Sequence, residues 1–344
     1  MACRRISNVT DMEDEMRKAK ALAIMAAFSL AVTTSLSAAP IVIKLGHVEP
    51  EDRSTHKATV EFKNYVETQS GGRLSVEIFP NGQLGGDRQM TESVALGVLQ
   101  MTIPATSVLT TYNKLFGVLD LPFVFNDEKA AFAALDGDVG KKLNALLAPV
   151  GLRNLGYGYN GARHMSNNLR PITQPSDLKG IKMRVMESPT FIELFKLLGA
   201  NPTPMAFGEV FTGLQQKTVD AQENSASLVY SMKFNEVQKY YSLTGHVQGI
   251  LAYIINEKFF TGLPADLQKI VADGARKYLV ERQRQLEVDD TATFLKKLAA
   301  GGMIINEITP ANHQKFVDAL KPMYANFAKA NGQDILDLIA KYNK

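Results

Sequence analysis

Hydrophobic and polar positions alternate first at strand spacing and then at helical spacing along the first third of the chain. Residues 41–45 alternate and stop at a glycine, which predicts a strand, and apolar positions recur at helical spacing over 54–69. Alternation returns over 73–79, followed by a predicted helix over 86–96 and a predicted strand over 98–103. Strands that alternate with helices in this way predict a parallel sheet covered by helices on both faces.

A second series of strands and helices follows, and 344 residues are enough for two domains. We therefore predict an α/β fold with two domains. The last strand of the second series is expected to return to the first sheet. The predicted elements are a helix over 127–147, extended structure over 152–166, a strand over 181–186, a helix over 189–198, a turn over 201–204, a helix over 207–216 and strands over 218–222 and 249–256.

The carboxyl-terminal part of the chain is predicted to be helical over an unusual length. Over 264–300 the only glycine is Gly274, proline is absent after the first residue, and apolar residues recur at roughly helical intervals. An unbroken helix of this length would measure about 55 Å, which exceeds one small domain. We therefore expect it to span both domains, followed by a strand over 303–308 and closing helices over 312–329 and 334–342.

The amino terminus carries the pattern of an export signal. An apolar run over 21–36 follows three basic residues and precedes small residues, which predicts a signal peptide over 1–39, cleaved near Ala39, and a periplasmic protein. The alternative, a membrane anchor, is disfavoured because the run is shorter than about 20 residues and contains serine and threonine. The acidic stretch over 11–15 does not suit a signal peptide, so we expect translation to begin at Met16.

Composition narrows the classes of function. The chain is 45% hydrophobic and 21% charged, as in ordinary globular proteins, and a formal net charge of +3 does not indicate a nucleic-acid partner. The single cysteine, Cys3, precedes the expected cleavage site, so the exported chain would lack disulfides and thiolate ligands. The histidines show no metal-binding spacing. The motif over 156–161 matches G-x-G-x-x-G, but extended residues follow it where a dinucleotide site needs a helix, so we expect no cofactor.

Arg184 is the strongest candidate for a binding residue. It lies in the apolar run over 181–186, which predicts a buried strand, and a guanidinium group at the end of such a strand needs an anionic partner. The chain after the strand over 218–222 is also polar and includes Asn224. If these strands are parallel neighbours, their carboxyl ends face the crevice in which open α/β sheets bind ligands. The chain is therefore predicted to bind a small organic anion, and no motif predicts that it cleaves one.

Other candidate residues have a structural interpretation as well as a functional one. Arg163, near the end of an extended segment, could be a surface arginine or form a structural ion pair, and Asn224 could cap the helix that follows it. Phe207 could pack in the core. His47 and Glu49 follow the first strand and could reach the crevice, and they are the only groups that a rival interpretation, a periplasmic enzyme, could use.

Several short motifs occur in a fixed order along the chain. They are 82–88 (GQLGGDR), 119–123 (LDLPF), 159–163 (YNGAR), 182–185 (KMRV), 201–210 (NPTPMAFGEV) and 219–224 (VDAQEN). Together they resemble the DctP-type solute-binding proteins of tripartite ATP-independent periplasmic (TRAP) transporters, and the likeness covers nearly all of the chain from Ile41.

The resemblance implies a periplasmic-binding-protein-like fold, in which two α/β domains close over an organic acid. Domain I would comprise 40–160 plus about 250–288, and domain II would comprise 161–249 plus about 289–344. The long helix over about 264–300 would bridge the two domains.

The resemblance also implies roles for individual residues. Arg184 would form the main salt bridge with the ligand carboxylate, assisted by Arg163 and Asn224, and Phe207 would line the pocket. We add Thr106, which lies after the third predicted strand, where sialic-acid-binding relatives carry an acidic residue that this chain lacks.

The implied function is that of a monomeric periplasmic protein, neither an enzyme nor embedded in the membrane, that delivers a C4-dicarboxylate or a sugar acid to TRAP membrane subunits. Two alternatives stay open at this point. One is a periplasmic enzyme that acts on a small organic acid, and the other is a ligand-sensing partner of a signalling receptor, which would share the fold and the site.

Overall fold

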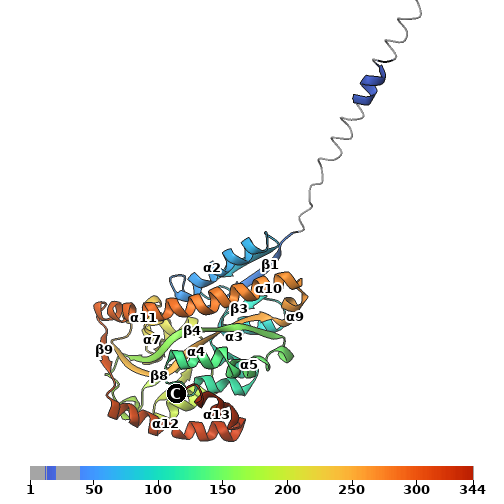
Figure 1. Ribbon diagram of the computed structural model, residues 1–344. Helices are drawn as coiled ribbons and strands as arrows, with labels where there is room; N and C mark the ends of the chain where they lie inside the picture. Colours follow the sequence, from blue (N-terminus) through green and yellow to red (C-terminus); the bar gives the residue numbers. More distant parts are fainter. Residues whose placement is uncertain (1–11, 13, 21–38, 344) are drawn as a thin grey trace, which may run out of the picture. The chain divides into compact units, whose positions relative to one another are not determined.

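The computed structural model describes residues 12, 14–20 and 39–343 (Figure 1). The chain divides into two units, Met1–Ala39 and Pro40–Lys344. In the first unit residues 12 and 14–20 are helical, whereas the apolar run over 21–36 lies outside the described residues. The export signal and its cleavage near Ala39 therefore stay predictions. Within the described ranges, no helix combines the length and the apolar composition that a bilayer crossing requires.

A mixed sheet of nine strands forms the frame of the second unit, in the order β2-β1-β3-β8-β4-β7-β5-β6 with β9 beside β8 (Figure 1). The strands are β1 (Ile41–Gly46), β2 (Leu74–Phe79), β3 (Met101–Thr102), β4 (Leu152–Asn167), β5 (Lys182–Val185), β6 (Asn201–Pro204), β7 (Ala221–Asn224), β8 (Tyr240–Asn256) and β9 (Ile304–Glu307). The predicted α/β class is therefore confirmed, and the return of the chain to the first sheet is made by β8.

The directions of the strands bring two sets of strand ends together. Strands β1, β2 and β3 are parallel to one another, and so are β5, β6 and β7. Strand β3 runs antiparallel to β8 with Thr102 opposite Ile254, and β7 runs antiparallel to β4 with Asn224 opposite His164. Because β4 and β8 are long antiparallel partners, both sets of carboxyl ends point toward the middle of these two strands.

The long helical segment matches its prediction. Helix α10 (Ala265–Gly274), a π-helical segment (Ala275–Arg282) and α11 (Gln283–Ala300) follow one another without a break. The first two of these segments pack on α2 (Ser54–Gln69), and α11 packs on α8 (Ala226–Ser231) and β4. The helix therefore contacts elements of both predicted domains.

The remaining helices cover the sheet and form the carboxyl-terminal end (Figure 1). They are α3 (Asp87–Ala95), α4 (Glu128–Asp136), α5 (Asp138–Asn144), α6 (Pro189–Leu197), α7 (Val210–Gln215), α9 (Glu257–Gly262), α12 (Pro310–Asn331) and α13 (Asp334–Ala340). Short 3₁₀ helices include η1 (Thr106–Thr111), η2 (Lys114–Asp120) and η5 (Phe207–Glu209).

Several predictions of local structure are wrong. The single helix over 127–147 is divided into α4 and α5, because Gly137 leaves helical geometry (φ −95°, ψ −144°) and a Cβ there would lie 2.9 Å from the carbonyl oxygen of Ala133. The turn over 201–204 is β6, an edge strand of the sheet, where prolines are tolerated because one side of the backbone needs no ladder partner.

The predicted extents of two strands and the predicted position of a third strand are also wrong. Strand β8 starts at Tyr240 instead of 249, since polar residues in its first half hide the alternation. Strand β3 is shorter than the predicted strand over 98–103. Strand β7 (Ala221–Asn224) starts three residues after the predicted strand over 218–222.

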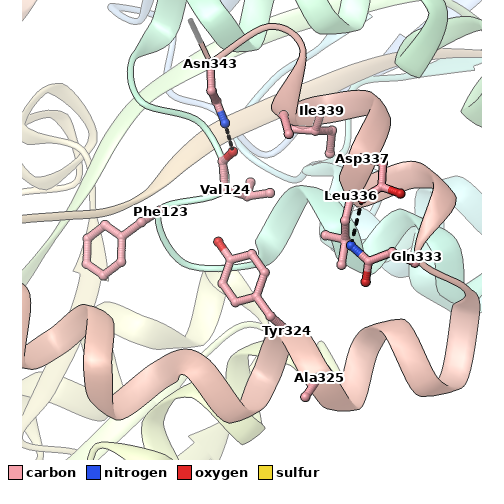
Figure 2. Close-up of a pocket in the computed structure, with 10 residues that line it drawn as sticks. Phe123, Val124, Tyr324, Ala325, Gln333, Leu336, Asp337, Ile339 and Asn343 are labelled. Carbon is pink, nitrogen blue, oxygen red and sulfur yellow. Dashed lines mark hydrogen bonds between the residues drawn. The ribbon is translucent and has the colours of Figure 1, made fainter.

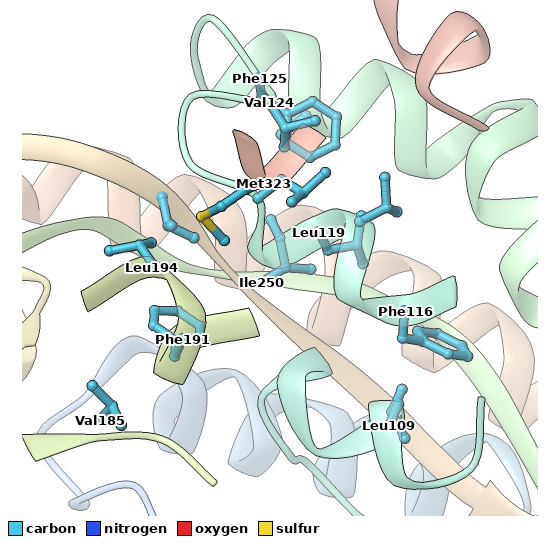
Figure 3. Packing of buried hydrophobic residues seen from close by; sticks show 14 of the residues in the cluster. Leu109, Phe116, Leu119, Val124, Phe125, Val185, Phe191, Leu194, Ile250 and Met323 are labelled. Carbon is cyan, nitrogen blue, oxygen red and sulfur yellow. The ribbon is translucent and has the colours of Figure 1, made fainter. Parts of the chain in front are cut away.

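The apolar side chains pack in three clusters. One lies between α2, β1 and the α10 end of the long helix, and one between α7, α8 and α11. The largest joins segments that are far apart in the chain, and Figure 3 shows part of it, with Leu119, Phe191, Ile250 and Met323. This cluster supports β4, β5 and β8 around the point toward which the strand ends are directed.

Candidate functional site

Arg184 is a buried arginine without an ion pair. It lies on β5, only 2% of its surface is exposed, and its Nε and Nη2 atoms both donate to the carbonyl oxygen of Met205, at 3.1 and 2.7 Å. The other buried arginines of the described chain, Arg53, Arg163 and Arg284, each have a carboxylate within 4.0 Å, whereas Arg184 has none among the described residues. Its positive charge is therefore left without a direct counter-charge.

Burial lowers the pKa of Arg184 to about 10, with Glu223 nearby raising it and Arg163 lowering it further. The side chain is therefore still charged at neutral pH. A charge that is removed from water without a partner is costly, and a bound anion would offset this cost.

Arg163 forms an ion pair with Glu223. Its Nε donates to Oε2 of Glu223 at 2.5 Å, and its Nη2 donates to Oε1 and to the backbone oxygen of Glu223, both at 2.7 Å. Burial alone would raise the pKa of Glu223, but Arg163 and His246 outweigh it and hold this pKa at about 2. The structure therefore places Arg163 in a buried ion pair, one of the two structural interpretations that the sequence left open, and its predicted contact with a ligand stays a prediction.

Asn224 ends β7 and is buried. Its Nδ2 donates to Oε1 of Gln222 at 2.6 Å, and its backbone oxygen accepts from the Tyr241 hydroxyl at 2.9 Å. The N-cap of α8 is Ser225, so Asn224 does not have the capping role that the sequence also allowed. The predicted parallel pairing of the Arg184 strand with this strand is present, through Met183 opposite Ala221.

Phe207 begins η5 and is half-buried. Its ring packs edge-to-face on Phe234 with centroids 6.3 Å apart, at the margin of the α7–α8–α11 cluster. The residue thus has a core contact, and it follows by two positions Met205, whose carbonyl oxygen holds the Arg184 guanidinium.

His47 and Glu49 lie beyond the carboxyl end of β1 and are both buried. Nε2 of His47 is 3.2 Å from Nδ1 of His56, and Nδ1 of His47 has no hydrogen-bond partner among the described residues. Burial, aided by the neighbouring His56, lowers the pKa of His47 to about 3, so the ring is neutral. Glu49 accepts from Nε of Arg53 at 2.9 Å.

Arg53 is a functional candidate that the sequence did not reveal. Besides Glu49 it contacts Glu287 of α11 at 3.2 Å, and it donates to Ser227 of α8 and Asn160 of β4. It therefore joins the loop after β1 to elements of both predicted domains. No pattern in the chain indicates this role, because Arg53 stands in a polar stretch that is typical of a surface loop.

Asp87 is a second residue that the sequence did not single out, although it belongs to the motif over 82–88. Its Oδ2 accepts from the backbone N–H of Ala105 at 3.3 Å, whereas its Oδ1 is shielded from solvent and has no partner among the described residues. Burial raises the pKa of Asp87 to about 7, the nearby Glu49 raises it too, and Arg184 lowers it. The carboxyl group is thus close enough to both Glu49 and Arg184 for their charges to act on it.

Two further polar residues stand beside these elements. Thr106 is buried and donates from its hydroxyl group to the carbonyl oxygen of Ile250 on β8, at 3.3 Å. Asp120 accepts from the hydroxyl groups of Ser107 and Ser188, at 2.6 and 3.1 Å, and burial raises its pKa to about 7. Ser188 precedes α6 directly after the Arg184 strand, so Asp120 ties the segment after β3 to this strand end.

A pocket of about 370 Å³ lies elsewhere, between α12, α13 and the chain at Val124 (Figure 2). Asn343 donates to the Val124 carbonyl oxygen at 2.7 Å, and the Tyr324 hydroxyl donates to the Pro122 carbonyl oxygen at 2.6 Å. The one charged residue in its lining is Asp337, so this pocket presents no cation to an organic acid. No three histidine, cysteine, aspartate or glutamate side chains in the described ranges are grouped as a metal site requires.

Comparison with known proteins gives one consistent result. Residues 45–331 match the model of the family described as bacterial extracellular solute-binding protein, family 7 (DctP). The 2,3-diketo-L-gulonate-binding periplasmic protein YiaO of Escherichia coli is 36% identical over 299 residues, which are 87% of this chain and 89% of that protein. The C4-dicarboxylate-binding periplasmic protein DctP of Vibrio cholerae is 33% identical over 94% of this chain and 99% of its own length.

Solved structures show the same likeness. The sugar acid binding protein DctPAm from Advenella mimigardefordensis, in complex with galactonate, has a TM-score of 0.85 and 34% identity, over 88% of this chain and 99% of that chain. A TRAP periplasmic solute-binding protein from Shewanella oneidensis with bound succinate has a TM-score of 0.86 and 32% identity, over 89% of this chain and 100% of that chain.

Proposed function

The chain belongs to family 7 of the bacterial extracellular solute-binding proteins, the DctP family, and we propose that it captures a small organic acid through Arg184 and delivers it to the membrane subunits of a TRAP transporter. It would do so in the periplasm, as a monomer and without chemical change to the acid. The observation that carries the proposal is the buried guanidinium group of Arg184, which has no ion pair among the described residues.

A carboxylate is the partner that best fits this group. Its two oxygen atoms accept two parallel hydrogen bonds from a guanidinium fork. Hydrogen bonds to charged groups contribute about 1.5–3 kcal/mol each, so two or three of them plus burial of the ligand approach the ~8 kcal/mol of micromolar affinity. The relatives with bound galactonate and succinate both hold carboxylates.

The sheet supports a closing motion between two domains, 40–160 plus about 250–288 and 161–249 plus about 289–344. The chain passes between these domains along β4 and β8, where Gly161 pairs with Gly249 and the ladder shifts register beside Gly161. Residues from both sides, such as Glu49 and Arg184, lie at the facing strand ends. A ligand that contacts both sides favours the closed arrangement. Closure excludes water from the site, and this strengthens the electrostatic contacts of the ligand.

The Arg184→Lys variant tests the proposal. Lysine keeps the charge but loses the planar fork, so we expect at least a tenfold weaker affinity for whichever acid a thermal-shift screen of organic acids identifies. Isothermal titration calorimetry measures this, and Arg73→Lys, at an exposed arginine paired with Asp266, is the matched control. An unchanged affinity in Arg184→Lys would contradict the proposed role, and conversion of the acid into a product would favour an enzyme instead.

A further inference from the structure

A buried cluster of polar side chains joins the loop after β1 to α8 and α11. Arg53 pairs with Glu49 of its own loop at 2.9 Å and with Glu287 of α11 at 3.2 Å. It also donates to the hydroxyl group of Ser227, in the first turn of α8. Glu287 accepts two more hydrogen bonds, from Ser54 at 2.5 Å and from Ser227. A single carboxylate on the long helix therefore receives donors from the loop and from α8.

The contacts of this cluster cross the boundary between the two predicted domains. The loop over 52–54 belongs to the first domain, whereas α8 belongs to the second. The same two elements also meet at the surface, where Ser231 of α8 donates to Oδ2 of Asp52 at 2.9 Å. The paired residues of the Arg53–Ser227 and Asp52–Ser231 contacts are 174 and 179 positions apart in the chain. These contacts therefore depend on how the domains are placed relative to each other.

The cluster lies beside the point where β4 passes from one predicted domain to the other. Asn160, the last residue of the first domain on β4, accepts a hydrogen bond from Arg53. The next residue, Gly161, has a φ of +87°, and a Cβ there would lie 3.2 Å from Oε1 of Glu287. The ladder between β4 and β8 shifts register at this place. A rotation of the domains at this irregular point would move α8 away from the loop over 52–54.

We propose that Arg53, Ser227 and Glu287 form a latch that holds the two domains together once they have closed. The inference rests on the proposed function, because that function supplies the closing motion. It goes further by assigning the lifetime of the closed arrangement to side chains other than the one that holds the acid. In the open arrangement, Ser227 lies apart from Arg53, and water hydrates the guanidinium group.

The latch acts on opening more than on closing. Its hydrogen bonds form only after the domains have met, and contacts of this kind change the rate of separation more than the rate of approach. Two of its three members are charged, and hydrogen bonds to charged groups are stronger than those between neutral groups. Arg53 keeps Glu49 of its own loop as a counter-charge when the domains separate. The latch can therefore open without leaving an unpaired buried cation.

Single-molecule fluorescence resonance energy transfer tests the latch in the full chain. Cys3→Ser removes the single cysteine of the sequence. Dyes attached at Glu92→Cys in α3 and Gln215→Cys in α7, two exposed positions in different predicted domains, report the distance between the domains. The dwell times of the closed and open arrangements are recorded without acid, with galactonate and with succinate, the acids that the related structures hold.

We expect Glu287→Gln to shorten the closed dwell time about tenfold and Ser227→Ala about threefold, since the first removes a charged acceptor and the second a neutral hydroxyl group. The rate of closing should change less than about twofold in both variants. Neither substitution removes the pairing of Arg53 within its own loop. Glu257→Gln is the matched control, because Glu257 pairs with Arg153 at 2.6 Å inside the first predicted domain. Melting curves confirm that each variant is folded.

The inference is overturned if Glu287→Gln and Ser227→Ala keep the closed dwell time of the wild type, if they slow closing instead, or if Glu257→Gln shortens the closed dwell time as much. Should Glu287→Gln fail to fold, the result for Ser227→Ala decides.

The failure of the proposed function looks different. In that case no acid of the screen binds, or Arg184→Met binds its acid as tightly as the wild type, and the dwell times recorded without acid still test the latch. Acid binding that is lost in Arg184→Met, together with unaltered dwell times in the latch variants, would refute the latch and leave the proposed function in place. A wild type with one interdomain distance under all conditions would overturn both.

Discussion

Replacement of Glu223 by glutamine removes the counter-charge of a buried arginine while keeping the shape of the side chain. In the wild type, Glu223 accepts two hydrogen bonds from the Arg163 guanidinium through its carboxylate, and its Oε2 lies 3.3 Å from Nε2 of His246. The amide cannot neutralise Arg163, which then stays buried as an unpaired cation. We therefore expect Glu223→Gln to destabilise the fold.

The pKa of Glu223 indicates the size of the loss. The folded state holds this pKa at about 2, below the ordinary value of 4.5. Linkage converts this lowering to about 3 kcal/mol of stability at neutral pH, near the lower end of the ~3–5 kcal/mol for breaking a buried pair. Because the folded state favours the carboxylate, the contribution is complete above pH 4.5 and is lost as the pH falls through 2.

Equilibrium unfolding in urea at pH 7, followed by circular dichroism, measures the effect. The set of proteins is the wild type, Glu223→Gln, Arg163→Met, the double variant, and Asp138→Asn as an exposed control. The double variant should be more stable than Glu223→Gln, since it no longer contains the unpaired cation. A loss below about 1 kcal/mol in Glu223→Gln, or additive effects in the double variant, would refute the reasoning.

Two further variants probe buried charges. The stability of Asp120→Asn relative to the wild type should increase as the pH rises from about 4 to about 8. The folded state raises the pKa of Asp120 to about 7 from 3.8, so ionisation of this group destabilises the wild type as the pH rises. Melting temperatures of both proteins at the two pH values measure this, and a pH-independent difference contradicts it. Arg184→Met should keep or raise the melting temperature of the ligand-free protein while it abolishes acid binding, since it removes a buried cation without an ion pair. A fall of more than about 3 °C would show that Arg184 stabilises the ligand-free fold.

The sequence predicted what depends on local spacing. Helix α2 has its predicted bounds, Ser54–Gln69, because its apolar positions and the glycines after it are signals within one segment. Arg184 was predicted to be buried for a similar reason, since its neighbours in β5 are apolar and continuous in the chain. The long helix was predicted from the near-absence of glycine and proline over many turns.

What the sequence did not predict depends on contacts between distant segments. Arg53 and Glu287 are separated by most of the chain, and only the fold brings them within 3.2 Å. The first half of β8 is buried although it is polar, because β4 and β9 flank it and pair its backbone. Asp87 contacts the segment that carries Ala105, whose backbone N–H donates to its carboxylate. No pattern in the sequence around Asp87 reveals this neighbour.

The late position of β8 in the chain constrains the order in which the protein folds. Strand β3 has β1 on one side and needs Ile254 and Ile255 of β8 on the other. Until these residues have been made, the amino-terminal half presents an open strand edge, which is prone to pair with other chains. Incomplete chains should therefore need protection from aggregation until residue 256 is available to pair.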